Sequence, residues 1–152
     1  MSFFEQEIIP YVGFGGIKLL QDRRDVEEIL KNNNLNFQIE HISNMECSVK
    51  VPWIILNIGE SIKLYFAKNK LWKMVFCKGY LGALPNGIKT GMKMNDALQI
   101  DTKLEFEDFE EIYISQNGYW LEDNLLDGCV DCISIFIKEA VDDSVFYQYR
   151  WC

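Results

Sequence analysis

The sequence predicts an α+β domain with a mainly antiparallel sheet and a few short helices. Aromatic residues make up 14% of the chain, Ile and Val are common, and there are only three prolines, a composition that favours strands. Most apolar residues fall in short runs separated by turn-forming residues, and only two segments have helical spacing. The 152 residues (1–152) fit a single domain that can bury a core without disulfides or a metal.

The N-terminal half predicts one helix followed by strands. Gly13-Phe-Gly-Gly16 is expected to form a turn, and the apolar spacing from Ile17 to Leu30 then indicates a helix with Asp22 as its N-cap. The asparagines at 32–34 end this helix. Strands are predicted at 35–42, at 53–58 as a central strand buried on both faces, and at 61–66 and 71–76 as a hairpin, before a loop at 79–87.

The C-terminal half predicts the same order of elements. Gly87-Ile-Lys89 repeats Gly16-Ile-Lys18 at an offset of 71 residues, and Asp96 matches Asp25 at the same offset. A short helix is expected around 94–100, followed by strands at 104–106, 111–115 and 119–122 and a last pair at 132–138 and 145–151. These matches suggest an internal repeat of residues 16–78 and 87–138, whose halves share one antiparallel sheet.

Nearly all of the excess negative charge lies in the C-terminal half. Residues 1–86 carry a net charge of +1 and residues 87–152 a net charge of −9, which together give −8. Nucleic-acid binding requires clusters of Lys and Arg, so we expect no nucleic-acid partner. A basic protein is the expected partner, because complementary charge speeds association. The acidic N-terminus and the lack of a long apolar run predict a cytoplasmic protein with no membrane partner.

Two acidic segments that contain aromatic residues, 105–111 and 118–131, are candidate docking surfaces. Phe106 and Phe109 alternate with carboxylates, so we expect the rings to pack inwards and the acids to face solvent. Tyr119 and Trp120 are expected anchors, because Trp and Tyr often carry much of the binding energy at interfaces. A solvated face and a core rim are the alternative interpretations. The predicted partner-binding residues are Glu105, Glu107, Asp108, Glu110, Glu111, Tyr119, Trp120, Glu122, Asp123, Asp127 and Asp131.

The common catalytic motifs are absent from the sequence, including G-x-S-x-G, H-E-x-x-H and the P-loop. His41 is the only histidine and is expected at a strand surface, although a pair with Cys47 or Cys77 stays open. Cys129-Val-Asp-Cys132 has C-x-x-C spacing, but a structural zinc site needs four ligands, so we expect reduced thiols. We therefore predict that the protein is not an enzyme and has no metal or cofactor.

The region 80–140 combines a glycine-led short helix with acidic, aromatic strands. Its segments are Gly87-Ile-Lys-Thr-Gly-Met-Lys-Met-Asn-Asp-Ala-Leu98, Leu104-Glu-Phe106, Ser115-Gln-Asn-Gly-Tyr-Trp-Leu-Glu122 and Ile133-Ser-Ile-Phe-Ile137. This pattern resembles small bacterial immunity proteins of polymorphic toxins, including those of contact-dependent growth inhibition. The resemblance implies a protein that binds a toxin domain from a neighbouring gene and blocks its active site or an adjacent surface. Such toxins are often nucleases with basic clefts.

We accordingly predict an immunity protein that occludes the active site of a cognate toxin, expected to be a nuclease, with its acidic surface. The alternative is a small cytoplasmic enzyme or ligand-binding domain with a pocket between sheet and helices, in which His41 or a cysteine reacts. A structural or adaptor subunit is a third interpretation. The sequence predicts no oligomeric state.

Overall fold

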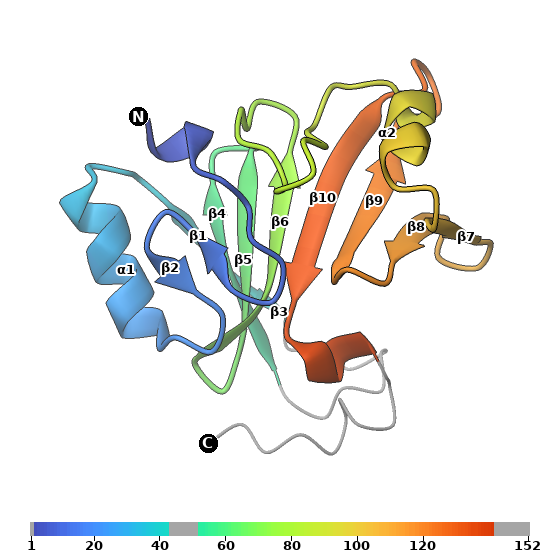
Figure 1. The fold of residues 1–152 in the computed structure, drawn as a ribbon. Helices are drawn as coiled ribbons and strands as arrows, with labels where there is room; N and C mark the ends of the chain where they lie inside the picture. The colour runs from blue at the N-terminus through green and yellow to red at the C-terminus, as the bar shows by residue number, and fades with distance from the viewer. Residues whose placement is uncertain (1, 43–51, 142–152) are drawn as a thin grey trace.

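The computed structural model describes residues 2–42 and 52–141, which form one large antiparallel sheet of eight strands and a small sheet of two (Figure 1). The order in the large sheet is β3-β4-β5-β6-β10-β9-β8-β7. The α+β fold class, mainly sheet, is therefore confirmed. The strands are β1 (Gly13–Phe14), β2 (Ile17–Lys18), β3 (Gln38–Ile42), β4 (Trp53–Ile58), β5 (Ile62–Ala67), β6 (Lys70–Cys77), β7 (Glu105–Glu107), β8 (Ile112–Ser115), β9 (Tyr119–Asp123) and β10 (Val130–Phe136).

Two α-helices pack against the same core. α1 (Arg23–Asn32) buries Val26 and Leu30, and α2 (Met94–Ile100) buries Met94 and Ala97. Figure 1 shows α1 beside the first half of the sheet and α2 beside the second half. Two 3-10 turns, η1 (Phe3–Glu5) and η2 (Lys138–Val141), complete the helical elements of the described residues, none of which is long and apolar enough to cross a membrane.

Strand alternation divides the apolar side chains between the two faces of the sheet. Leu64 and Phe66 belong to the main core with the helices, whereas Tyr65 and Ala67 join a smaller cluster with Trp72. The main core continues across the second half through buried aliphatic side chains on the same face. These are Leu121, Val130, Ile133 and Ile135.

Each half of the chain runs from a helix into a four-stranded meander, and the two fourth strands, β6 and β10, pair antiparallel at the centre. The same backbone hydrogen bonds join the start of each helix to its fourth strand. In the first half they run from Leu20 N–H to Leu71 O (2.6 Å), from Leu71 N–H to Gln21 O (3.1 Å) and from Arg23 N–H to Asn69 O (2.8 Å). In the second half they run from Gly91 N–H to Val130 O (2.8 Å), from Val130 N–H to Met92 O (2.7 Å) and from Met94 N–H to Gly128 O (2.9 Å).

Equivalent positions before the helices are 71 residues apart, the offset seen in the sequence, and Leu20 and Gly91 even share a positive φ, at 69° and 87°. This shared geometry supports the predicted repeat of residues 16–78 and 87–138, which stays a prediction.

Most predicted elements are present, and three predictions need correction. The first helix begins directly after Asp22, its predicted N-cap residue, but Ile17, which the apolar spacing assigns to the helix, instead pairs with Phe14 as part of β2. The run 53–58 is β4, which is second from the sheet edge rather than central. β10 has β6 and β9 on its two sides, so no edge is left for the expected pairing of 132–138 with 145–151. Residues 145–151 lie outside the described part of the chain.

Gly91 tests how much the shared backbone geometry contributes to stability. Gly91→Ala is expected to lower the free energy of unfolding by about 1–2 kcal/mol, because an alanine is strained at positive φ. An added Cβ meets no atom within 4 Å at this position, so the loss reflects the backbone alone. Urea denaturation measures it, and Gly91→Asn, which tolerates positive φ better, should lose clearly less. Equal stability of Gly91→Ala and wild type would contradict this account.

Candidate functional site

Three strands at one edge of the sheet bring the two acidic segments together. β8 lies between β7 and β9, and Glu107 is opposite Ile112 while Tyr113 is opposite Leu121. A groove of about 360 Å³ lies where the turn after β7 meets the end of β9. We call it the acidic groove, and it is lined by Phe106, Glu110, Glu111, Tyr113, Glu122, Asp123 and Leu125.

The acidic groove carries carboxylates that form no ion pair among the described residues, although the Lys73 ammonium interacts electrostatically with Glu110 and Glu122. Glu110, Glu111, Glu122 and Asp123 all line the groove. Like charges gathered in a hollow raise the local concentration of cationic groups and speed their association. The groove is therefore suited to the ammonium and guanidinium groups of a basic partner.

Large exposed apolar side chains belong to the same two segments as these carboxylates, and one of them, Leu125, lines the groove. Phe109 is 87% exposed, Leu125 86% and Leu126 96%. The prediction that Phe109 packs inwards is thus wrong, and Phe106 is 51% exposed although its ring lies 4.9 Å from that of Tyr113. The physical reason is position, because β7 is the last strand of the sheet and no described strand lies beyond it to cover these rings. Large apolar side chains exposed beside charged groups are found at many protein interaction sites.

Local hydrogen bonds hold the segments that carry these side chains. The Glu110 N–H donates to the Glu107 carboxylate in the turn after β7. In the turn after β9, the Leu126 N–H donates to Asn124 Oδ1 (2.9 Å) and the Cys129 N–H to Asp127 Oδ1 (2.9 Å). A partner that binds Leu125 and Leu126 consequently meets a turn that is already ordered, which lowers the entropic cost of association.

The other predicted acids lie outside the lining of the groove. Glu105 and Asp108 are exposed beside it, and Glu107 is half-buried with its carboxylate engaged by the turn. Asp127 lies 4.0 Å from Lys78 Nζ, and Asp131 is half-buried at the bulge in β10. The structure thus brings four of the nine predicted acids into the groove and leaves five around or beyond it.

The two predicted aromatic anchors do not line the groove. Tyr119 is 1% exposed within the main core and is not available to a partner. Trp120, the next residue on β9, points to the opposite face, where its ring lies 4.5 Å from that of Phe136 and 5.4 Å from Lys73 Nζ. Burial lowers the pKa of that lysine. The anchor prediction is therefore corrected for Tyr119, whereas Trp120 is not part of the groove lining although alternation places it on the same face of β9 as Glu122.

Tyr119 belongs to a buried polar network around Asp101 that the sequence did not reveal. The Tyr119 and Ser115 hydroxyls donate to Asp101 Oδ2 at 2.5 and 2.8 Å, and the Asn86 amide donates to the Tyr119 hydroxyl at 3.1 Å. Burial acts to raise the pKa of Asp101, but these hydrogen bonds outweigh it and the pKa is lowered. Burial and Asp101 raise the pKa of Tyr119 to about 12. The network ties the end of α2 to the β8–β9 hairpin.

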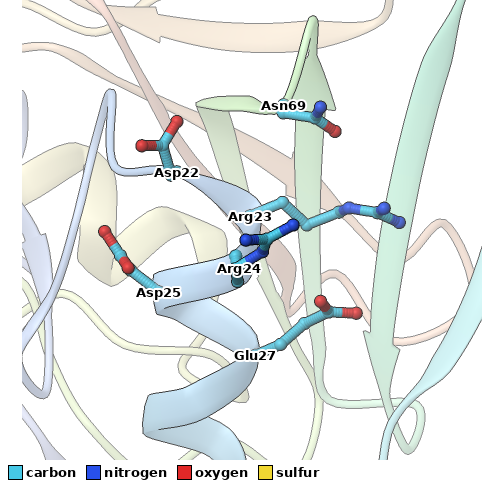
Figure 2. Close-up of a pocket in the computed structure, with 6 residues that line it drawn as sticks. All are labelled: Asp22, Arg23, Arg24, Asp25, Glu27 and Asn69. Atoms are coloured by element: carbon cyan, nitrogen blue, oxygen red, sulfur yellow. The ribbon is translucent and has the colours of Figure 1, made fainter.

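A second hollow, of about 300 Å³, lies at the start of α1 (Figure 2). It is lined by Asp22, Arg23, Arg24, Asp25, Glu27 and Asn69. Figure 2 shows carboxylates and guanidinium groups interleaved around it, and Asp22 also pairs with Lys70 at 2.8 Å. Charges of both signs cancel here, so this hollow lacks the one-sided potential of the acidic groove.

The candidate reactive groups of the enzyme interpretation lie apart from one another. His41 is exposed on the edge strand β3, and Cys77 lies on β6, three strand spacings across the sheet and six residues along β6 from Leu71, the residue level with His41. Cys77, Cys129 and Cys132 are free thiols, and Cys47 lies outside the described residues. Within residues 2–42 and 52–141, no three His, Cys, Asp or Glu side chains are grouped to hold a metal ion.

No family model, curated protein or solved structure matches this chain. The acidic groove is accordingly identified by its own charge, exposure and shape. Sequence reasoning located the two acidic segments and missed Tyr113 and Leu125, since only the pairing of β7, β8 and β9 places them between the acids.

Tyr119→Phe tests the Asp101 network. Loss of the hydroxyl should lower the free energy of unfolding by about 2 kcal/mol at about pH 7, because a buried carboxylate loses a donor. The folded-state pKa of Asp101 is lowered, so this stabilisation is complete above its ordinary value of 3.8 and disappears as the pH falls through the folded-state value. Urea denaturation over that pH range measures the difference from wild type. Tyr113→Phe, on the half-buried neighbouring tyrosine, is the control; a pH-independent loss in Tyr119→Phe would contradict the assignment.

Proposed function

We propose that this protein is an immunity protein, which binds a cognate bacterial toxin domain through the acidic groove and covers the active site of that toxin. The observation that carries the proposal is the convergence of four carboxylates, which form no ion pair among the described residues, with exposed apolar side chains, from two separate segments, in one groove. The resemblance of residues 80–140 to immunity proteins supports the same function. A basic nuclease cleft is the complementary surface.

Two kinds of contact contribute to binding, one to the association rate and the other to the lifetime of the complex. The carboxylates of Glu110, Glu111 and Glu122 attract Lys and Arg side chains over several ångströms and so determine the association rate. Leu125, Leu126 and Phe109 lose contact with water when a partner covers them, and this burial determines how long the complex lasts.

The same carboxylates explain how the protein would block the active site of the toxin. A nuclease cleft binds phosphates with its basic residues, and an acidic surface that occupies the cleft pairs with those residues in place of nucleic acid. Inhibition is then stoichiometric and requires no reaction. The direct test expresses the toxin domain encoded beside this gene with and without the protein and scores growth. Failure of the wild-type protein to restore growth, although it is folded and in excess, would overturn the proposal.

Reversing the charge of the groove should slow binding. Glu110→Lys/Glu111→Lys/Glu122→Lys is expected to reduce the association rate constant at least 10-fold at low salt and to weaken its dependence on ionic strength. The matched control is Glu7→Lys/Glu28→Lys/Glu60→Lys, which alters exposed acids elsewhere and changes the net charge equally. Stopped-flow binding to the toxin domain at two salt concentrations compares them. Equal slowing in both variants would show that net charge matters and the groove does not.

Removing the exposed leucines should instead shorten the lifetime of the complex. Leu125→Ala/Leu126→Ala is expected to raise the dissociation rate constant about 10- to 100-fold, as the loss of a central apolar contact does. Its free energy of unfolding should stay within about 0.5 kcal/mol of wild type, because both side chains are exposed. Leu81→Ala, on an exposed leucine elsewhere, is the control for dissociation. An unchanged lifetime would remove these leucines from the interface.

A further inference from the structure

Two cysteines face each other where the halves of the sheet join. In the register of β6 with β10, Cys77 and Cys132 are direct cross-strand partners, although 55 positions separate them in the sequence. They belong to different halves of the chain. A covalent bond between them would connect the N-terminal meander to the C-terminal meander at the central strand pair.

The geometry of this pair is close to that of a disulfide. The two Sγ atoms lie 2.8 Å apart, roughly 0.8 Å more than the S–S bond length of about 2.05 Å. Directly opposed residues of antiparallel strands have Cα atoms about 4.5–5.5 Å apart, inside the range that disulfides span. Bond formation therefore needs rotation of the side chains and no movement of the strands.

Both thiols are partly exposed to solvent, but their surroundings shift their pKa values in opposite directions. The hydrogen bond with Cys132 lowers the pKa of the Cys77 thiol, and Lys63 favours its thiolate while burial opposes it. The same hydrogen bond and burial raise the pKa of Cys132 above its ordinary value. Because the thiolate is the nucleophilic form, Cys77 is the group that attacks an oxidant first.

We propose that Cys77 and Cys132 form a redox modification site, at which a peroxide converts the two thiols into a reversible disulfide across β6 and β10. The Cys77 thiolate attacks one oxygen of hydrogen peroxide, the O–O bond breaks, and a sulfenic acid and hydroxide form. Cys132 then attacks the sulfenic sulfur, the S–S bond forms, and water leaves with the proton of Cys132. Overall, two thiols lose two electrons and two protons, and one peroxide is reduced to two waters.

The C-x-x-C spacing of Cys129 and Cys132 suggests a different pair, which the structure does not favour. Cys129 precedes β10, bridges to Lys93, and has its Sγ 3.8 Å from the Asp127 carbonyl oxygen. Cys132 lies beyond the bulge of β10 with its sulfur against Cys77. This inference does not require the proposed partner, although Cys132 is also opposite Glu122, which lines the acidic groove.

Peptide mapping of the full chain after treatment with hydrogen peroxide tests the site. Trypsin together with cleavage before aspartate gives Met74–Lys78 for Cys77, Asp131–Lys138 for Cys132 and Asp127–Val130 for Cys129, so every pairing has its own mass. We expect a linked Met74–Lys78 and Asp131–Lys138 species that dithiothreitol removes. The oxidised protein should melt about 8–16 °C higher than the reduced protein, because the bond closes a long loop.

Matched variants assign the roles of the three thiols. Cys129→Ser should retain the linked species, whereas Cys132→Ser should lose it and leave Cys77 as a sulfenic acid that dimedone traps. Linkage of Cys129 to Cys132 would overturn the proposal. Recovery of Cys77 and Cys132 as unlinked thiols or sulfinic acids after peroxide treatment of the wild-type chain would overturn it as well.

Discussion

The pairing of β6 with β10 is the contact on which the rest of the structure depends. Each half supplies a helix and four strands, and their fourth strands meet in antiparallel register from Lys73 with Phe136 to Cys77 with Cys132. On the helix side, Met74, Phe76, Ile133 and Ile135 are buried in one core that neither half encloses alone. The join converts two small meanders into a single sheet and leaves β3 and β7 as its edges.

This join also decides where the charge of the second half is displayed. Because β10 is central, the strands that precede it run outwards, and β7 and its acidic turn reach the edge farthest from β3. Seven strand spacings of about 4.8 Å separate these edges. The acidic segment 105–111 therefore lies at one edge of the sheet, where the acidic groove is found.

The carboxylates of the C-terminal half have different physical roles. The residues next to them in the sequence do not predict which role each one has. Asp101 is buried and accepts hydrogen bonds from Tyr119 and Ser115, and Glu107 closes a turn through the Glu110 N–H. Glu122 lines the groove with no described ion-pair partner. The acidic groove, a turn and a buried network thus all use carboxylates, and what separates these roles is which groups the fold places around each carboxylate.

The fold class, both helices, the β5–β6 hairpin and the two acidic segments can be predicted from the sequence, because alternation, helical spacing and turn residues are local signals. Tertiary structure alone decided the strand order, since pairing of β6 with β10 joins residues far apart in the chain. It also decided that Tyr119 is buried and Phe109 exposed, because alternation places a side chain on a face but only the neighbouring elements determine whether that face is covered. The opposition of Cys77 and Cys132 has the same origin: sequence spacing pointed to Cys129, and the register of two distant strands selected Cys77.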